Sequence, residues 1–200
     1  MESGYERVAD TSEIPIGKTK KVLVQGIGHV GEVLVSHLTK EGATVYINDI
    51  SQERLKVVAD KYKAEVVAAD KMFDMDIDIY APCALGATVN NDTLSRLKCK
   101  IICGAANNQL ADEKVHGVLV AKSGILYAPD FVVNAGGIIN VYYELEGYNR
   151  ERALAHAEKI YDTTYNLFQL AKKENIPTYM AANRLGEQRI EAIARINAVL

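Results

Sequence analysis

The sequence has few cysteines, few prolines and no surplus of charge of one sign. Its 200 residues include three cysteines and four prolines, with 48% apolar and 24% charged residues. This composition excludes collagen-like, low-complexity and disordered classes, and it predicts an ordinary globular protein. Basic side chains number 23 and acidic ones 26, for a formal net charge of -3. Because no long run of like charge occurs, we do not expect nucleic acid as a partner.

The three cysteines do not form a disulfide or metal-binding pattern. Cys99 and Cys103 stand four residues apart in an apolar run, and Cys83 is remote from both in sequence. If the run is a strand, roughly 13 Å separates the two thiols, which is too far for a disulfide. No histidine falls at ligand spacing, so a zinc site is not expected. The sequence predicts reduced thiols, as in cytoplasmic proteins.

Neither a targeting segment nor a membrane span is indicated. Residues 1–17 are polar, carry acids and resemble neither a signal nor a transit peptide, so we interpret them as a lead or linker segment. The longest apolar stretch, 131–141, is interrupted by Asn134, Gly136, Gly137 and Asn140. It is far shorter than the roughly 20 apolar residues of a membrane span. We expect a soluble, cytoplasmic protein with no membrane partner.

Short β-branched runs alternate with segments of helical period up to about residue 148. Strands are expected at 22–25, 44–48, 65–67, 77–81, 100–104 and 125–127, with further strand pairing at 131–133 left open. Helices are expected at 30–40, from Ser51 to about 62, from Asn91 or Asp92 to about 97, and at 112–121. In the first helix the period places Val30, Val33, Leu34 and Leu38 inward, with Gly42 at the helix C-terminus. This alternation predicts an α/β fold with a doubly wound, mostly parallel sheet.

From Asn149 onward the pattern is purely helical. Asn149 is a plausible N-cap for a long amphipathic helix, and Pro177 precedes a second helix that begins at Thr178. The apolar positions of that second helix are Leu185, Ile190, Ile193 and Ile196. We therefore divide the chain into a lead segment (1–17), an α/β domain (18–148) and a C-terminal helical segment packed on it (149–200).

A glycine-rich motif follows the first predicted strand. Residues 26–31, GIGHVG, fit GxGxxG and open the first predicted helix. In a dinucleotide-binding loop, Gly26 makes the tight turn, Gly28 lets a pyrophosphate approach, and Gly31 lets the helix pack closely. The N–H groups at the helix N-terminus then face the phosphates. A purely structural turn is the alternative, because the motif alone is weak.

Asp49 strengthens the nucleotide hypothesis. It ends the second predicted strand, where the fingerprint expects an acid to hold the adenosine ribose. A carboxylate there repels a 2′-phosphate, and Ile50 and Ser51 place no arginine beside it, so NAD is favoured over NADP. Arg54 is the nearby residue that blurs this choice. The alternative for Asp49 is a solvated acid at a strand end.

His29 lies inside the glycine loop, but we do not expect it to be catalytic. In that position the backbone approaches the phosphates while the side chain points away. His37, His116 and His156 fall on helical segments without an acid or cysteine companion.

Three further loops combine small residues with amides at predicted strand ends. They are APCALG at 81–86, GAANNQ at 104–109 and NAGG at 134–137. In a doubly wound sheet, ligands bind outside the carboxyl ends of the strands, where these loops would gather. Asn107 and Asn134 could then bind a nicotinamide carboxamide, its ribose or a substrate carboxylate, or could only satisfy turn backbones. Cys83 is an improbable nucleophile because no general base accompanies it.

Several long motifs in order resemble one enzyme family. VQGIGHVG followed by NDI, then DIYAPCALGATVNNDTL, GAANNQL, YAPDFVVNAGGIINV and GYNRERAL, are similar to the cofactor-binding half of the leucine, valine and phenylalanine dehydrogenases. The resemblance covers about residue 18 to the C-terminus. It implies a Rossmann-type fold and, in the full enzyme, the NAD-dependent deamination of a branched-chain or aromatic L-amino acid to the 2-oxo acid and ammonia.

The resemblance also implies roles for individual residues. The pyrophosphate loop would comprise Gly26, Ile27, Gly28, His29, Val30 and Gly31, with Asp49 and Ile50 at the adenosine ribose. Ala81, Pro82, Cys83 and Ala84 would pass beside the nicotinamide, near Ala106 and Asn134. Asn107 would touch the nicotinamide ribose or the substrate, and Ile138 and Val141 would line the pocket for the substrate side chain.

The chain departs from the family at its N-terminal side. The family carries its catalytic lysine, a second lysine and a catalytic aspartate on an N-terminal domain, whereas here some twenty residues precede the glycine loop. Gly17 and Lys18 form the single Gly-Lys pair, where the lead segment ends. We therefore expect no catalytic or metal-binding residues in this chain, and cofactor binding without catalysis. The alternatives are a free-standing NAD(H)-binding module, or one that works with a separate catalytic chain, and a structural domain without nucleotide. An oligomer of the full enzyme stays open.

Overall fold

The computed structural model describes residues 20–197. The predicted lead segment (1–17) and Lys18 lie outside these residues. Six parallel strands form one sheet in the order β3-β2-β1-β4-β5-β6. The strands are β1 (Lys21–Gln25), β2 (Thr44–Asn48), β3 (Glu65–Val66), β4 (Ile79–Pro82), β5 (Ile101–Ile102) and β6 (Leu126–Tyr127). The order reverses between β1 and β4, which confirms the doubly wound α/β prediction.

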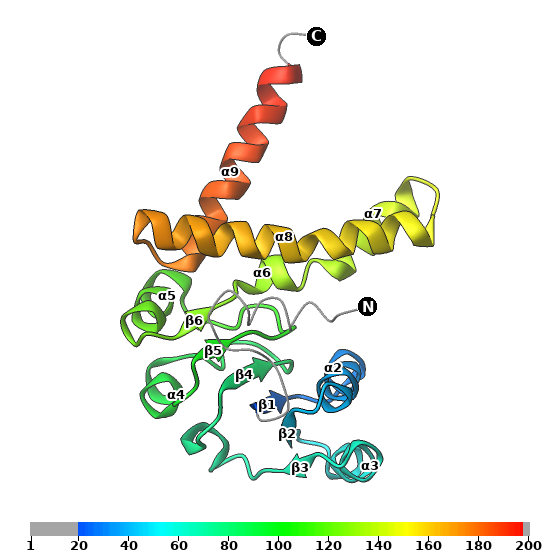
Figure 1. The fold of residues 1–200 in the computed structure, drawn as a ribbon, viewed down its shortest axis with the longest axis vertical. Helices are drawn as coiled ribbons and strands as arrows, with labels where there is room; N and C mark the ends of the chain where they lie inside the picture. The colour runs from blue at the N-terminus through cyan, green and yellow to red at the C-terminus, as the bar shows by residue number, and fades with distance from the viewer. Residues whose placement is uncertain (1–19, 198–200) are drawn as a thin grey trace.

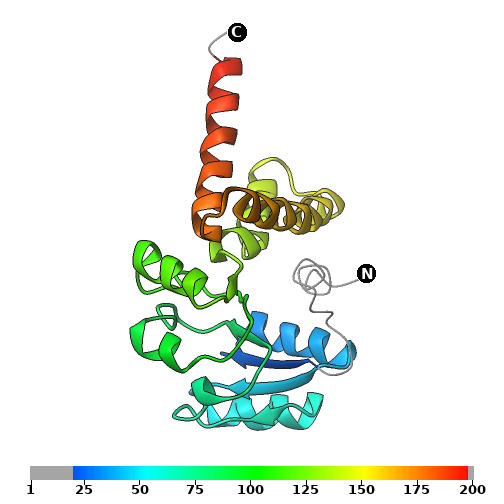
Figure 2. The same ribbon diagram turned by 60° about the vertical axis from the view of Figure 1, so that its left-hand side comes forward.

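Helices cover both faces of this sheet (Figures 1 and 2). One side carries α2 (His29–Lys40) and α3 (Gln52–Tyr62), and the other carries α4 (Asn91–Arg96) and α5 (Glu113–Lys122). A 3₁₀ turn, η1 (Met72–Asp74), precedes β4. The remaining helices are α6 (Asp130–Val133), α7 (Gly136–Leu145), α8 (Arg150–Glu174) and α9 (Thr178–Asn197).

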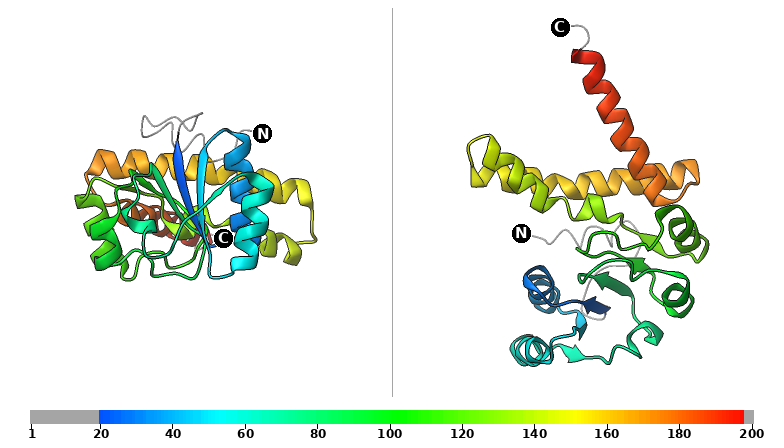
Figure 3. Two further views of the ribbon diagram at one scale, coloured as in Figure 1. Left: turned by 90° about the horizontal axis from the view of Figure 1, so that it is seen from below. Right: turned by 180° about the vertical axis from the view of Figure 1, so that it is seen from behind.

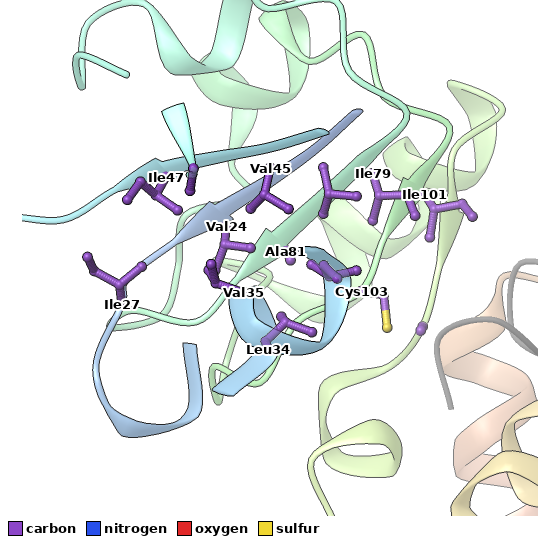
Figure 4. Packing of buried hydrophobic residues seen from close by; sticks show 14 of the residues in the cluster. Val24, Ile27, Leu34, Val35, Val45, Ile47, Ile79, Ala81, Ile101 and Cys103 are labelled. Carbon is purple, nitrogen blue, oxygen red and sulfur yellow. The ribbon is translucent and has the colours of Figure 1, made fainter. Parts of the chain in front are cut away.

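The sheet divides the core into two layers because successive side chains of a strand point to opposite faces. Val24 of β1 packs with Leu34 and Val35 of α2 in one layer (Figure 4), which also contains Val22, whereas Leu23 packs in the other. The central strands are buried on both faces, which explains their continuous apolar sequence.

Polar side chains cap the first turns of four helices. The side chains of Ser51, Asn90, Asp112 and Asn149 each accept a backbone N–H in the first turn of α3, α4, α5 and α8. Gly42 has a φ of +87° directly after α2, where an L side chain would be strained. These positions confirm the predicted helix boundaries to within one or two residues.

One local prediction was wrong, and one alternative that the sequence left open is decided by the structure. Val30 and Val33 of α2 are 60% and 56% exposed, because the buried stripe runs through Gly31, Leu34, Val35 and Leu38 instead. Residues 131–133 do not extend the sheet. They form the short helix α6, which begins after Pro129, and the glycine-containing stretch that follows them forms the unpredicted helix α7.

The C-terminal helices leave the layered body. Helix α8 packs against α6, α7 and α9, and α9 extends away from the sheet (Figures 1 and 3). Ile190, Ile193 and Ile196 of α9 are 70%, 50% and 62% exposed. The predicted amphipathic stripe therefore exists, but residues 20–197 do not cover its C-terminal half. Over the same residues, no helix combines the length and apolar character needed to cross a membrane.

Candidate functional site

The glycine loop joins the carboxyl end of β1 to α2, beside the reversal of strand order. Gly26 has a φ of +89°, and a Cβ placed on it would lie 2.6 Å from the backbone nitrogen of Ala84. A Cβ on Gly31 would clash with the carbonyl oxygen of Gly26. Both positions therefore exclude a side chain because of the protein's own packing.

Gly28 lacks a side chain for a different reason. Among residues 20–197, no atom lies within 4 Å of the place where its Cβ would stand, and its φ of -65° suits any residue. Gly28 is the N-cap of α2, and no side chain caps this helix, in contrast to α3, α4, α5 and α8. The first N–H groups of α2 therefore face open space with the positive end of the helix dipole behind them. Such an end fits a phosphate group.

Asp49 lies immediately beside this loop. One carboxylate oxygen, Oδ2, accepts the backbone N–H of Ile27 at 2.8 Å, and the other, Oδ1, accepts the backbone N–H of Ser51 at 2.8 Å. The side chain of Ile50 next to it is fully exposed. His29 is also exposed, at the first position of α2, which agrees with a surface role.

The loop after β4 packs between the glycine loop and the loop after β5. Ala81 and Pro82 are buried at the end of β4, and the Cβ of Cys83 lies 3.5 Å from a Cβ placed on Gly31. Cβ atoms on Gly86 and Gly104 would clash with the carbonyl oxygens of Asn107 and Pro82. Burial raises the pKa of the Cys83 thiol, which makes the thiolate scarce at neutral pH. That Cys83 is not a nucleophile stays a prediction.

The two predicted amides lie next to each other. Asn134, which follows α6, donates from Nδ2 to Oδ1 of Asn107 in the loop after β5, at 2.6 Å. This bond leaves the Asn107 amide N–H groups and the Asn134 carbonyl oxygen available to a ligand. The pair therefore presents a donor and an acceptor side by side on the exposed side of the site.

Two residues that we did not predict shape the loop after β5. Gln109 is fully buried, and its Nε2 donates to the carbonyl oxygens of Gly104 at 2.7 Å and Ala106 at 3.0 Å. Its backbone N–H donates to Oδ2 of Asp130 at 2.8 Å. Gln109 and Asp130 thus hold the loop that carries Asn107. The only sequence signal was a third amide after the Asn-Asn pair, which does not by itself indicate burial.

The predicted substrate-pocket residues are not gathered into an enclosed cavity. Ile138 and Val141 lie on α7 with 73% and 54% of their surface exposed within residues 20–197. Their assignment to a pocket stays a prediction. Among the described residues, no group of three or more His, Cys, Asp or Glu side chains is placed to hold a metal ion.

Comparison with known proteins relates this chain to amino-acid dehydrogenases. The profile of the Glutamate/Leucine/Phenylalanine/Valine dehydrogenase family matches residues 46–196. The chain is 50% identical to leucine dehydrogenase of Thermoactinomyces intermedius over 176 residues, 88% of this chain and 48% of that protein. It is 45% identical to an L-tryptophan dehydrogenase of Nostoc punctiforme over 170 residues, 85% of this chain and 48% of that protein.

Two solved structures are similar to this chain in fold. The crystal structure of L-tryptophan dehydrogenase from Nostoc punctiforme superposes with a TM-score of 0.92 at 40% identity, covering 96% of this chain and 58% of that one. The hetero-hexameric glutamate dehydrogenase from Thermus thermophilus shares the fold, with a TM-score of 0.76 at 18% identity, over 97% of this chain and 51% of that one. The chain spans about half the length of the curated relatives it matches.

Proposed function

The chain belongs to the glutamate/leucine/phenylalanine/valine dehydrogenase family, and from this premise we propose that it binds NAD(H) as the cofactor-binding unit of an amino-acid dehydrogenase. The observation that carries the proposal is the contrast within the glycine loop. Side chains at Gly26 and Gly31 are excluded by the protein's own packing, whereas the space at Gly28 is open and faces an uncapped helix N-terminus. A glycine that no contact within the described part of the chain requires is expected where a ligand approaches the backbone.

Asp49 and the amide pair extend this proposal along the length of a dinucleotide. Asp49 stands at the end of β2 beside the phosphate loop, where its remaining acceptor sites suit the hydroxyls of the adenosine ribose. Asn107 lies in the loop after β5, and Asn134 follows α6. The amide N–H groups of Asn107 and the side-chain carbonyl oxygen of Asn134 match a carboxamide. In this arrangement the adenosine lies over β2 and the nicotinamide lies toward β4 and β5.

The bound cofactor would supply the hydride acceptor for oxidation of an amino acid. The chain's own residues would bind and orient it: the start of α2 holds the phosphates, Asp49 fixes the ribose, and the amide pair sets the direction of the nicotinamide. The substrate, in this proposal, is a branched-chain or aromatic L-amino acid. We propose that the proton-transfer groups for its deamination lie in the part of the relatives that this chain does not span.

Titration with NADH tests the cofactor proposal directly. The chain has 11 tyrosines and no tryptophan, so energy transfer from tyrosine to bound NADH reports binding. We expect saturable binding. A linear signal without saturation would contradict the proposal and favour a structural domain.

A deamination assay tests whether the chain catalyses the reaction alone. With L-leucine, L-valine or L-phenylalanine and NAD, we expect no NADH above background, while leucine dehydrogenase of Thermoactinomyces intermedius serves as the positive control. Steady NADH production would show that this chain holds the proton-transfer groups itself. Loss of that production in Lys18→Ala would then assign one of them to Lys18.

A further inference from the structure

The carboxylate of Asp49 is bonded to backbone on two sides before any ligand is considered. Its Oδ2 accepts from Ile27, the residue between Gly26 and Gly28, and its Oδ1 accepts from Ser51, the N-cap of α3. Hydrogen bonds to an ionised acceptor are stronger than those between neutral groups. One side chain therefore connects the phosphate-binding loop after β1 with the turn after β2.

The loop has few other polar contacts at this point. The backbone N–H of Gly26 donates to the carbonyl oxygen of Asn48 at 2.7 Å, and the carbonyl of Gly28 already accepts from Glu32 in the first turn of α2. Between these two bonds, Ile27 is held by its buried side chain and by Asp49. Because its N–H is occupied, the N–H groups left for an anion are those at the start of α2. Asp49 thus also determines which backbone groups face the ligand.

The two backbone hydrogen bonds leave some acceptor positions of the Asp49 carboxylate unused. An ionised carboxylate offers about four acceptor positions, of which the backbone fills two, one on each oxygen. Each oxygen can therefore still accept a ribose hydroxyl. Building on the proposed NAD(H) binding, we propose that Asp49 is a positioning residue of the phosphate-binding loop, through which pyrophosphate binding and ribose binding depend on each other.

A positioning role of Asp49 can be distinguished from a simple ribose contact by comparing a ligand that has ribose hydroxyls with one that lacks them. Asp49→Asn keeps the shape of the side chain but replaces one acceptor oxygen with an N–H₂ group, which faces a backbone N–H donor. Only one of the two backbone N–H groups, that of Ile27 or that of Ser51, then keeps an acceptor, and this acceptor is a neutral oxygen in place of a charged one. The bond to Ile27 is therefore either lost or weakened. If Asp49 positions the loop, affinity for a diphosphate falls even when the ribose has no hydroxyls to bind.

ADP and 2′,3′-dideoxy-ADP are the probes for this test. By isothermal titration calorimetry, we expect Asp49→Asn to weaken both ligands by about tenfold or more, the size expected for a charge-assisted hydrogen bond. Asp60→Asn is the matched control, since Asp60 is an exposed acid of α3. It should leave both affinities unchanged. Unchanged affinity for 2′,3′-dideoxy-ADP in Asp49→Asn, with weaker ADP, would overturn the proposal in favour of a ribose contact alone.

A second measurement needs no ligand. In the free protein, hydrogen exchange of the Ile27 amide, followed by NMR, should be about tenfold faster in Asp49→Asn than in the wild type. If the wild type bound neither nucleotide, the NAD(H) proposal would fail, and this exchange rate would still decide the positioning role. An unchanged rate would overturn it.

Folding of the variant is checked by its thermal midpoint. If Asp49→Asn does not fold, Asp49→Glu replaces it, because the longer side chain keeps the charge but displaces the carboxylate. Faster exchange at Ile27 and weaker 2′,3′-dideoxy-ADP binding are again expected. Wild-type values of both in a folded Asp49→Glu protein would overturn the proposal.

Discussion

The backbone N–H of Ile27 donates to the carboxylate of Asp49 at 2.8 Å, across 22 residues of sequence. The glycine motif and the acid at the end of the second strand are usually described as contacts to different parts of a dinucleotide. In this protein they are bonded to each other. The geometry of the loop and the charge at the ribose position are therefore linked, and substitutions in one are expected to affect the other.

Substitutions at Gly28 and Gly31 are expected to have different effects, because the space at Gly28 is open whereas Gly31 packs against the backbone of Gly26. Gly28→Ala adds a Cβ in open space, so we expect a thermal midpoint within a few degrees of the wild type and a loss of NADH affinity of about tenfold or more. Gly31→Ala forces a Cβ against the Gly26 carbonyl and is expected to destabilise folding by about 1–3 kcal/mol. Thermal melts without ligand and NADH titrations measure both. Normal NADH binding by Gly28→Ala would show that the loop is only a turn.

Cofactor preference follows from the charge of Asp49. A 2′-phosphate would meet this carboxylate, and its neighbours Ile50 and Ser51 carry no positive charge, so we expect NADPH to bind about tenfold more weakly than NADH, or worse. Asp49→Ala should weaken NADH binding and reduce the ratio of the NADPH dissociation constant to the NADH dissociation constant. Asp60→Asn should leave that ratio unchanged. Equal binding of the two reduced cofactors by the wild type would refute the assignment. Arg54→Ala would then show whether that arginine compensates.

The Asn107–Asn134 bond predicts coupled effects on NADH binding. Asn107→Ala and Asn134→Ala each remove one side of the pair, and we expect each to weaken NADH by several-fold. The double variant should be less than additive, with a coupling of about 0.5–1 kcal/mol. A matched control is Asn140→Ala, since the Asn140 amide donates to Glu144 within α7 instead. Strict additivity would mean that the two amides act independently.

Alkaline pH should destabilise the protein through Cys99. Burial raises the pKa of this thiol to about 12, compared with about 8.5 in an unfolded chain. The folded state therefore keeps a proton that the unfolded state loses, so stability is complete below about pH 8.5 and declines as the pH rises toward 12. One such group contributes at most about 1.4 kcal/mol per pH unit.

Denaturant midpoints measured from pH 7 to 11 test this linkage. In Cys99→Ala the decline should be shallower than in the wild type. Val120→Ala, a truncation of another buried side chain, should lower the midpoint by a similar amount at every pH. An identical pH dependence in Cys99→Ala and the wild type would contradict the role of this thiol.

Much of the fold could be predicted because its signals are local. Ser51, Asp112 and Asn149 cap helices through backbone N–H groups three residues further along the chain, so their types and positions indicate the helix starts. The continuous apolar run of β1 likewise indicates a strand that is buried on both faces. By contrast, the predicted inward positions of Val30 and Val33 were wrong, because helical period gives a stripe but not which of two adjacent stripes faces the sheet.

The sequence by itself determined the alternation of strands and helices through β6, the glycine loop and the acid at the end of β2, since each depends on residue types within a few positions. Only the tertiary structure decided that Asp49 bonds to Ile27 and that Asn134 bonds to Asn107. It also decided that the buried side chain of Gln109 holds the loop that carries Asn107. The tertiary structure likewise shows that Ile138 is exposed within residues 20–197. These relationships join segments far apart in the chain. Their formation depends on how the parallel strands bring their carboxyl ends to one edge, which no local pattern records.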